Sequence, residues 1–102
     1  MGKRSYPPLK PSEVVAIVEA LGFSFKNQVG SHAHYERPAD STKPRTVVTV
    51  DMGKGEFYDF LMKNMIRESG FTRDQFYGAT KRTANRASVK FFKLRDSPET
   101  DA

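Results

Sequence analysis

A helical pattern that ends at a glycine and is followed closely by three strand-like segments most constrains the fold of this chain. The helix is indicated by apolar residues at the spacing of one helix face, which are Val14, Ile17, Val18 and Leu21. Pro11 stands where a first helical turn favours proline, and Gly22 stands where helices commonly end. Strands are predicted over residues 23–28, 32–37 and 46–51 from their alternating or β-branched composition. We therefore predict a meander of three antiparallel strands with helices covering one face, which is an α+β fold.

Two more helices are predicted after the third strand. The second helix is expected over residues 56–69, and its apolar set consists of Phe57, Phe60, Leu61, Met65 and Ile66. A short third helix is expected over residues 71–77, with Thr72 as its N-cap and Phe71 as a hydrophobic staple.

The 102 residues predict one domain with a modest core. We place this domain at residues 9–78, preceded by a mobile lead over residues 1–9. Residues 79–102 are expected to form a partly flexible tail that is first basic and then acidic. Within it, residues 88–94 either form a strand or become ordered only on a partner.

The charge and composition of the chain narrow its function classes. A formal net charge of +5 favours polyanionic partners, most often nucleic acid. The absence of cysteine excludes disulfides, thiolate zinc sites and cysteine catalysis. No apolar run reaches the length of a membrane span, and the N-terminal residues lack a signal-peptide core. We expect a cytoplasmic protein that needs no membrane, no metal and no cofactor.

The two histidines of the chain lie two residues apart in the predicted second strand. The side chains of His32 and His34 therefore point to one face of the sheet, while Ala33 and Tyr35 take the apolar face. We expect the histidines on the face that the helices leave open. Lys26 shares this face if Phe23 and Phe25 belong to the core. Histidine suits proton transfer near neutral pH.

These residue types are sufficient for cleavage of RNA, whose own 2′-hydroxyl is the nucleophile. His32 is the candidate base or acid, His34 a second one, and Lys26 or Lys54 the candidate for stabilising the phosphorane charge. Gly30 in the turn before the strand would let a phosphate approach the backbone.

Simpler readings of the same residues stay open. Two exposed histidines on a solvated strand and a Gly-Ser hairpin turn are common features. The nearest further metal ligands to His32 and His34 are Glu36 and Asp51, and they give no recognisable spacing for a metal site. The segment Gly53-Lys54-Gly55 is too short for a phosphate-binding loop. The basic tail with Phe91 and Phe92 is either a solvated segment or a track for a nucleic-acid backbone.

Three ordered pieces of the sequence resemble the HicA (YcfA-like) toxin family, the small mRNA interferases of HicAB toxin–antitoxin modules. The pieces are Leu9-Lys10-Pro11 with Leu21-Gly22-Phe23, then Gly30-Ser31-His32 with Tyr35, and finally Gly70-Phe71-Thr72 with Phe76. The resemblance covers about residues 9–78, and the basic tail beyond it has no counterpart in the minimal family.

The resemblance implies a double-stranded-RNA-binding-domain-like α-β-β-β-α fold with a C-terminal extension. It also implies a metal-independent endoribonuclease that cleaves mRNA and inhibits translation, with His32 as the catalytic residue and a HicB-like antitoxin as the partner. We expect the RNA to be contacted by Lys26, Gly30, Ser31, His34 and Lys54. A non-catalytic RNA-binding module on the same fold and a protein-interaction module are the alternatives.

Overall fold

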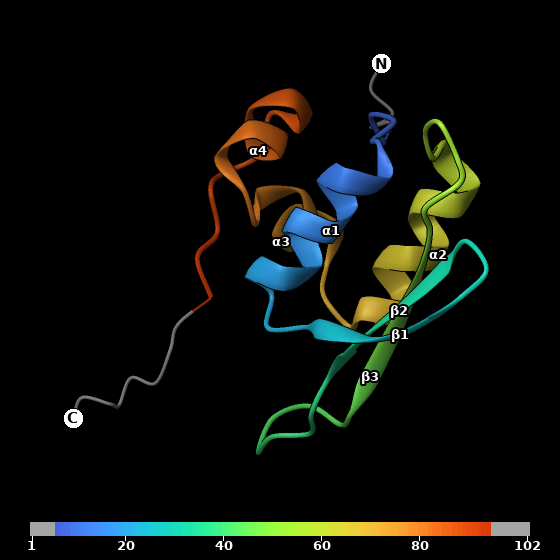
Figure 1. Cartoon of the computed structure of the whole chain (residues 1–102). Coiled ribbons are helices and arrows are strands. Elements are labelled where there is room, and N and C mark those ends of the chain that lie inside the picture. Colours follow the sequence, from blue (N-terminus) through green and yellow to red (C-terminus); the bar gives the residue numbers. More distant parts are fainter. Residues whose placement is uncertain (1–5, 95–102) are drawn as a thin grey trace.

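The computed structural model describes residues 6–94 and has the element order predicted from the sequence, with one helix more (Figure 1). The elements are α1 (Pro11–Ala20), β1 (Ser24–Val29), β2 (His32–Arg37), β3 (Thr46–Asp51), α2 (Asp59–Ser69), α3 (Arg73–Gly78) and α4 (Lys81–Ala87). Most of the expected mobile lead and the whole acidic end of the tail lie outside the described residues. Within residues 6–94, no helix is long and apolar enough to cross a membrane.

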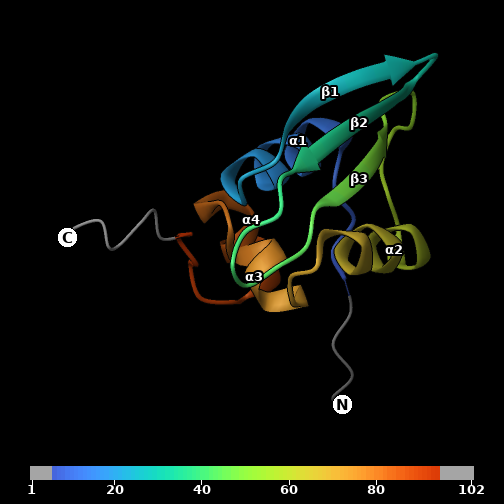
Figure 2. The same ribbon diagram turned by 90° about the horizontal axis from the view of Figure 1, so that it is seen from below.

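The three strands form one antiparallel sheet in the order β1-β2-β3, which confirms the predicted meander. The helices lie to one side of this sheet, with α2 beside β3 (Figure 2). β2 is the central strand, so the residues at its start have a partner on each side. His32 is paired with Val29 of β1 and with Asp51 of β3.

The alternation predicted for β2 is confirmed. Ala33 and Tyr35 are buried against the helices, whereas His32 is exposed and His34 is half-buried on the other face. β3 buries Val48 and Val50 completely on the same inner face. The sheet thus has a covered apolar face and an open polar face, and both histidines belong to the open one.

The burial expected for the first predicted strand is confirmed for Phe23 and wrong for Phe25. Phe23 is buried just before β1, but the side chain of Phe25 is 55% exposed and every residue of β1 is exposed. Phe25 lies edge-on against Tyr35, with 5.8 Å between the ring centroids, at the border of the core. β1 is an edge strand that extends beyond the helices (Figure 2), and this position leaves its inner face uncovered.

The second helix begins at Asp59, three residues later than predicted. The backbone of Phe57 is instead paired with that of Leu9, since each N–H donates to the other residue's carbonyl oxygen. Phe60, expected in the core, is 72% exposed, and Met62 is fully buried in its place. Met65 and Ile66 of the predicted apolar set are buried as expected.

The predicted cap of the third helix is confirmed, because the hydroxyl of Thr72 accepts a hydrogen bond from the N–H of Gln75. The helix α4 that follows is not predicted by the sequence. It is held to α3 by the hydroxyl of Thr83, which donates to the carbonyl of Tyr77 at 2.7 Å. Residues 88–94 contain no strand and run back along α3, where the N–H of Phe92 donates to the carbonyl of Gly78. The division of the chain at residue 78 stays a prediction.

Candidate active site

The turn between β1 and β2 places His32 at the first position of the central strand. Gly30 has a φ of +61°, in the left-handed region that favours glycine, and the side-chain amide of Gln28 donates to its carbonyl. A Cβ atom on Gly30 would meet no other atom within 4 Å, so the space beside this turn is open. The proposed approach of a phosphate to the backbone at this point stays a prediction.

His32 lies opposite Asp51 across the β2–β3 pair. The distance from the imidazole Nε2 to the carboxylate Oδ2 is 3.6 Å. The other oxygen, Oδ1, accepts a hydrogen bond from the hydroxyl of Ser31 at 2.8 Å and one from the N–H of Gly53 at 3.0 Å. One carboxylate oxygen therefore anchors the two turns, and the second faces the imidazole.

The pKa of Asp51 is held below its usual range, first by the hydrogen bond from Ser31 and then by that from Gly53. Partial burial opposes this shift, and the charges of His32 and Lys54 add to it. The carboxyl group is therefore ionised at neutral pH. A fixed negative charge beside His32 can orient the imidazole.

An open cleft of about 240 Å³ lies between β3 and α2, and His32 is part of its wall. Asp51 and Lys54 line the same side of the cleft. Its apolar floor consists of Phe57, Leu61 and Met65. The helix α2 thus borders the open face of the sheet along β3. The imidazole of His32 lies at a cleft rather than on a flat surface.

The structure brings together most, but not all, of the predicted site residues. Ser31 bonds to Asp51, Lys54 lines the cleft, and His34 is next on the same face, where its Nδ1 lies 2.9 Å from the hydroxyl of Thr49. Neither role predicted for these side chains, catalytic or RNA-binding, follows from this placement alone.

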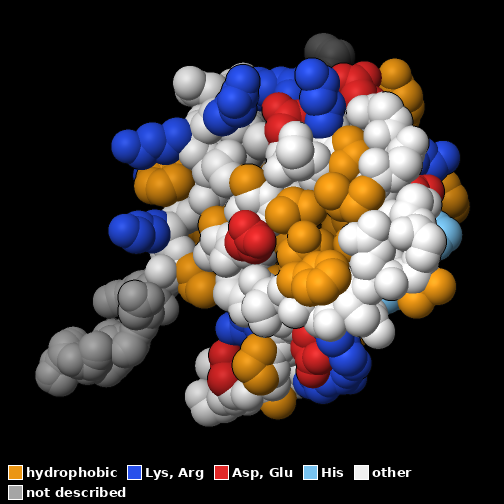
Figure 3. All heavy atoms as spheres, viewed as in Figure 1, with side chains coloured by type: hydrophobic (Ala, Val, Ile, Leu, Met, Phe, Trp, Pro, Cys, Tyr) orange, Lys and Arg blue, Asp and Glu red, His pale blue; other side chains and the backbone are white. Residues whose placement is uncertain are grey.

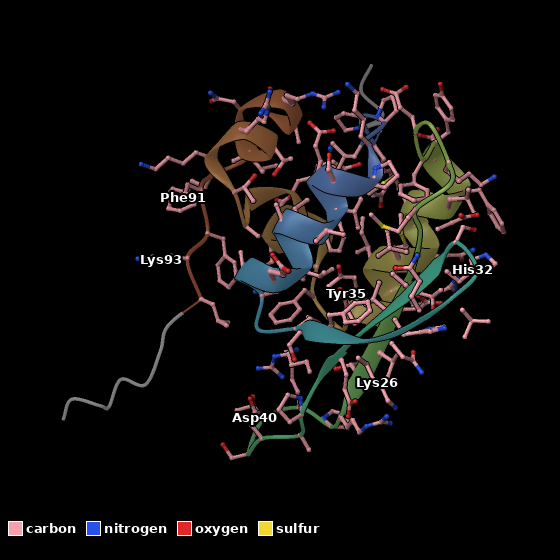
Figure 4. All side chains as sticks on the ribbon, in the orientation of Figure 1. Lys26, His32, Tyr35, Asp40, Phe91 and Lys93 are labelled. Atoms are coloured by element: carbon pink, nitrogen blue, oxygen red, sulfur yellow. The ribbon has the colours of Figure 1, made fainter. Side chains whose placement is uncertain are left out.

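Lys26 is not part of this group. Its Nζ lies 3.6 Å from the carboxylate of Glu36. Glu36 is four residues beyond His32 along β2, a separation of roughly 13 Å at about 3.3 Å per residue. Figure 4 shows His32 and Lys26 on separate parts of the sheet. Lys26 therefore shares the open face with His32 without sharing its cleft.

The basic C-terminal part lies on another side of the molecule. Lys and Arg side chains gather over α4 and the segment after it in Figure 3, while the histidines lie at the opposite rim. Figure 4 likewise places Phe91 and Lys93 far from His32. The ammonium group of Lys81 lies 5.6 Å from the centroid of the Phe91 ring.

Three residues of the site are not identified by the sequence. From the sequence, Asp51 is considered only as a metal ligand. Within residues 6–94, no group of three or more His, Cys, Asp or Glu side chains could hold a metal ion. Asn64 and Glu68 line the cleft from α2. Their spacing of four residues places both on one helix face, but only the packing of α2 beside β3 shows which face borders His32.

Comparison with known proteins adds one finding. A family model described as HicA toxin of bacterial toxin-antitoxin matches residues 11–71. The match runs from Pro11, the first residue of α1, to Phe71, two residues after the end of α2. It therefore includes every residue that lines the cleft. No curated protein matches the chain.

Proposed function

Because the chain belongs to the HicA toxin family of bacterial toxin–antitoxin systems, we propose that it is an endoribonuclease toxin that cleaves mRNA at His32. The observation that carries this proposal is the His32–Asp51 pair at the wall of an open cleft. An imidazole beside an ionised carboxylate is a suitable arrangement for general acid–base chemistry. The net charge of +5 supports a polyanionic substrate.

In the proposed reaction, His32 removes the proton of a ribose 2′-hydroxyl. The 2′-oxygen then attacks the adjacent phosphorus, and the bond from phosphorus to the 5′-oxygen breaks. The leaving 5′-oxygen takes up one proton from water, so the products are a 2′,3′-cyclic phosphate and a 5′-hydroxyl. The nucleophile belongs to the substrate, and for this reason the reaction requires no metal ion.

Asp51 and Lys54 have supporting roles in this reaction. Asp51 is a positioning residue, since it acts on the substrate through the imidazole of His32. Lys54 lines the same cleft and supplies a positive charge for the extra negative charge of the phosphorane. Ser31 keeps Asp51 in place through the hydroxyl-to-carboxylate hydrogen bond.

We further propose that a HicB-like antitoxin binds this chain and covers the cleft. The family is one of toxin–antitoxin systems, and a toxin of this kind needs an inhibitor that blocks its access to mRNA. Because mRNA is the proposed substrate, we place the action of the protein in the cytoplasm. Co-purification with the product of an adjacent reading frame would test the partner directly.

The test of the proposed function is RNA cleavage by purified protein in the presence of EDTA. The parent chain is expected to cleave single-stranded RNA, and His32→Ala to lose this activity while its circular dichroism spectrum and RNA affinity stay unchanged. His34→Ala is the matched control, because it removes the other imidazole of the same face and should leave most of the activity.

Three results would overturn the proposal. Equal cleavage by His32→Ala and the parent would remove His32 from the reaction. Salt-dependent binding of RNA that stays intact would favour the alternative of a non-catalytic RNA-binding module, for which the basic surface alone is sufficient. Failure both to bind and to cleave RNA would favour a protein-interaction module.

A further inference from the structure

The cleft beside His32 has a polar rim that the reaction itself does not use. Asn64 and Glu68 lie four residues apart on α2 and both line the cleft. Neither side chain contacts His32 or Asp51 in the described part of the chain. Their position across the cleft from the catalytic histidine is that of groups that bind a neighbouring part of the substrate.

The size and floor of the cleft fit a single flat ring. Its volume of about 240 Å³ is below the ~300–1,000 Å³ of typical pockets for larger ligands. Phe57 and Met65 are almost completely buried and so are fixed in position, while the half-buried Leu61 beside them offers apolar surface to the cleft. Nucleobases combine an apolar face with a polar edge, and proteins that bind unpaired bases use both.

Glu68 shows which part of the RNA lies at the rim. A carboxylate repels phosphate, so an acidic side chain in a basic RNA-cleaving protein is misplaced for backbone binding. The same carboxylate is a good acceptor for hydrogen bonds from a base. Asn64 supplies the complementary group, because its Oδ1 accepts from the guanidinium of Arg67 at 2.6 Å and its amide nitrogen stays available as a donor.

Guanine matches this arrangement better than the other bases. Its Watson–Crick edge carries two adjacent donors, N1–H and the N2 amine, which fit the two oxygens of one carboxylate. The neighbouring O6 is an acceptor for the amide of Asn64. Cytosine and adenine each offer one amine next to an acceptor nitrogen, and uracil offers one N–H between two carbonyl groups.

We infer that the cleft lined by Asn64 and Glu68 binds an unpaired guanine base next to the cleaved phosphodiester. This inference rests on the proposed function, because it assigns a substrate base to the same site. A base in the cleft brings its own ribose and phosphate to His32, which lines the same cleft from the side of β3. A base bound there is unpaired, so the substrate is single-stranded RNA.

The inference is tested first by binding, which does not depend on cleavage. The probe is a fluorescent uridine oligonucleotide with one central guanosine, without 2′-hydroxyl groups at the central positions so that it cannot be cleaved. Replacement of this guanosine by inosine removes only the N2 amine. We expect the parent protein to bind the inosine probe roughly tenfold more weakly, as for loss of a hydrogen bond to a charged group.

Glu68→Gln is the second arm of the test. This variant should bind the guanosine and inosine probes within about twofold of each other, while Glu19→Gln on α1 removes the same charge away from the cleft and should keep the discrimination. A circular dichroism spectrum checks that both variants are folded. If Glu68→Gln does not fold, the inosine comparison on the parent protein still decides the question.

Cleavage mapping separates failure of this inference from failure of the proposed function. On an RNA of mixed sequence, we expect guanine to be enriched at one of the two positions that flank the cleaved bonds. Cleavage without base preference, together with equal binding of the two probes, would overturn the guanine site and leave the nuclease in place. Discrimination between the probes without any cleavage would support the guanine site and overturn the nuclease.

Discussion

The imidazole Nε2 of His32 lies 3.6 Å from the carboxylate Oδ2 of Asp51, its direct partner across the β2–β3 strand pair. The register of two strands determines this relationship, so it does not depend on a loop conformation. Ser31 and Gly53 hold the other carboxylate oxygen. Strand pairing therefore places the imidazole of His32 beside the carboxylate of Asp51.

Asp51→Asn should reduce cleavage at least about tenfold, with the loss mainly in kcat. The replacing amide has the same shape, and its oxygen can still accept hydrogen bonds from Ser31 and Gly53. It has no negative charge, however, to orient the imidazole of His32. Single-turnover kinetics with the pH profile of parent and variant would check this role. An unchanged kcat and pH profile would exclude Asp51 as a positioning residue.

Ser31→Ala should raise the pKa of Asp51 toward its ordinary value, because the hydroxyl of Ser31 is the main cause of the depression. A carboxyl group with a depressed pKa stabilises the fold above its unfolded-state pKa, and this contribution is lost as the pH falls through the folded-state value. The variant should therefore lose stability at neutral pH and little at strongly acidic pH.

A carboxyl-detected NMR titration would measure the pKa of Asp51 directly. Ser24→Ala is the control, because it removes a hydroxyl from exposed β1 without contact to Asp51. A titration curve of Asp51 that does not move in Ser31→Ala would show that Gly53 alone is sufficient for the depressed pKa.

The open-face histidines are predictable because β2 is covered on one face only, so the alternation of Ala33 and Tyr35 with His32 and His34 indicates both faces. Phe25 follows the same kind of alternation and is exposed, since β1 extends past the helices. A period-2 pattern indicates the side to which a residue points. It does not indicate whether another element covers that side.

Long-range contacts account for the other differences. The start of α2 depends on the pairing of Phe57 with Leu9, which are 48 residues apart in the chain. The basic helix α4 has no apolar stripe of its own and is held by Thr83. Asp51 becomes part of the site only through the register that places it opposite His32. None of these partners lies within the local window that a sequence pattern describes.

Gly78→Ala should displace the segment after α4 and destabilise the fold by about 1–3 kcal/mol, as other overpacked core substitutions do. A Cβ atom on Gly78 would lie 2.5 Å from the backbone carbonyl oxygen of Lys90 and 3.3 Å from Phe92. Both elements would have to separate, and the hydrogen bond from the Phe92 N–H to the Gly78 carbonyl would be lost.

Hydrogen exchange of the Phe92 amide and chemical denaturation would measure the two effects of Gly78→Ala. Gly55→Ala is the matched control, because a Cβ atom there would meet nothing within 4 Å. If Phe92 stays protected in Gly78→Ala, the contact between α3 and the segment that follows α4 is looser than the structure indicates.

Lys54→Gln should lower kcat/KM several-fold, whereas Lys26→Gln should change it less than about twofold. Both substitutions remove one positive charge from an exposed lysine, so they change the net charge equally. Lys54 lines the cleft with His32. Lys26 is paired with Glu36, and this pair is separated from His32 by more than the Debye length of about 8 Å at physiological salt. In the proposed reaction the charge of Lys54 acts on the phosphorane, whereas that of Lys26 is largely neutralised and screened. Measurement of kcat/KM at several salt concentrations distinguishes the two lysines, and equal losses would mean that only the total charge of the open face matters.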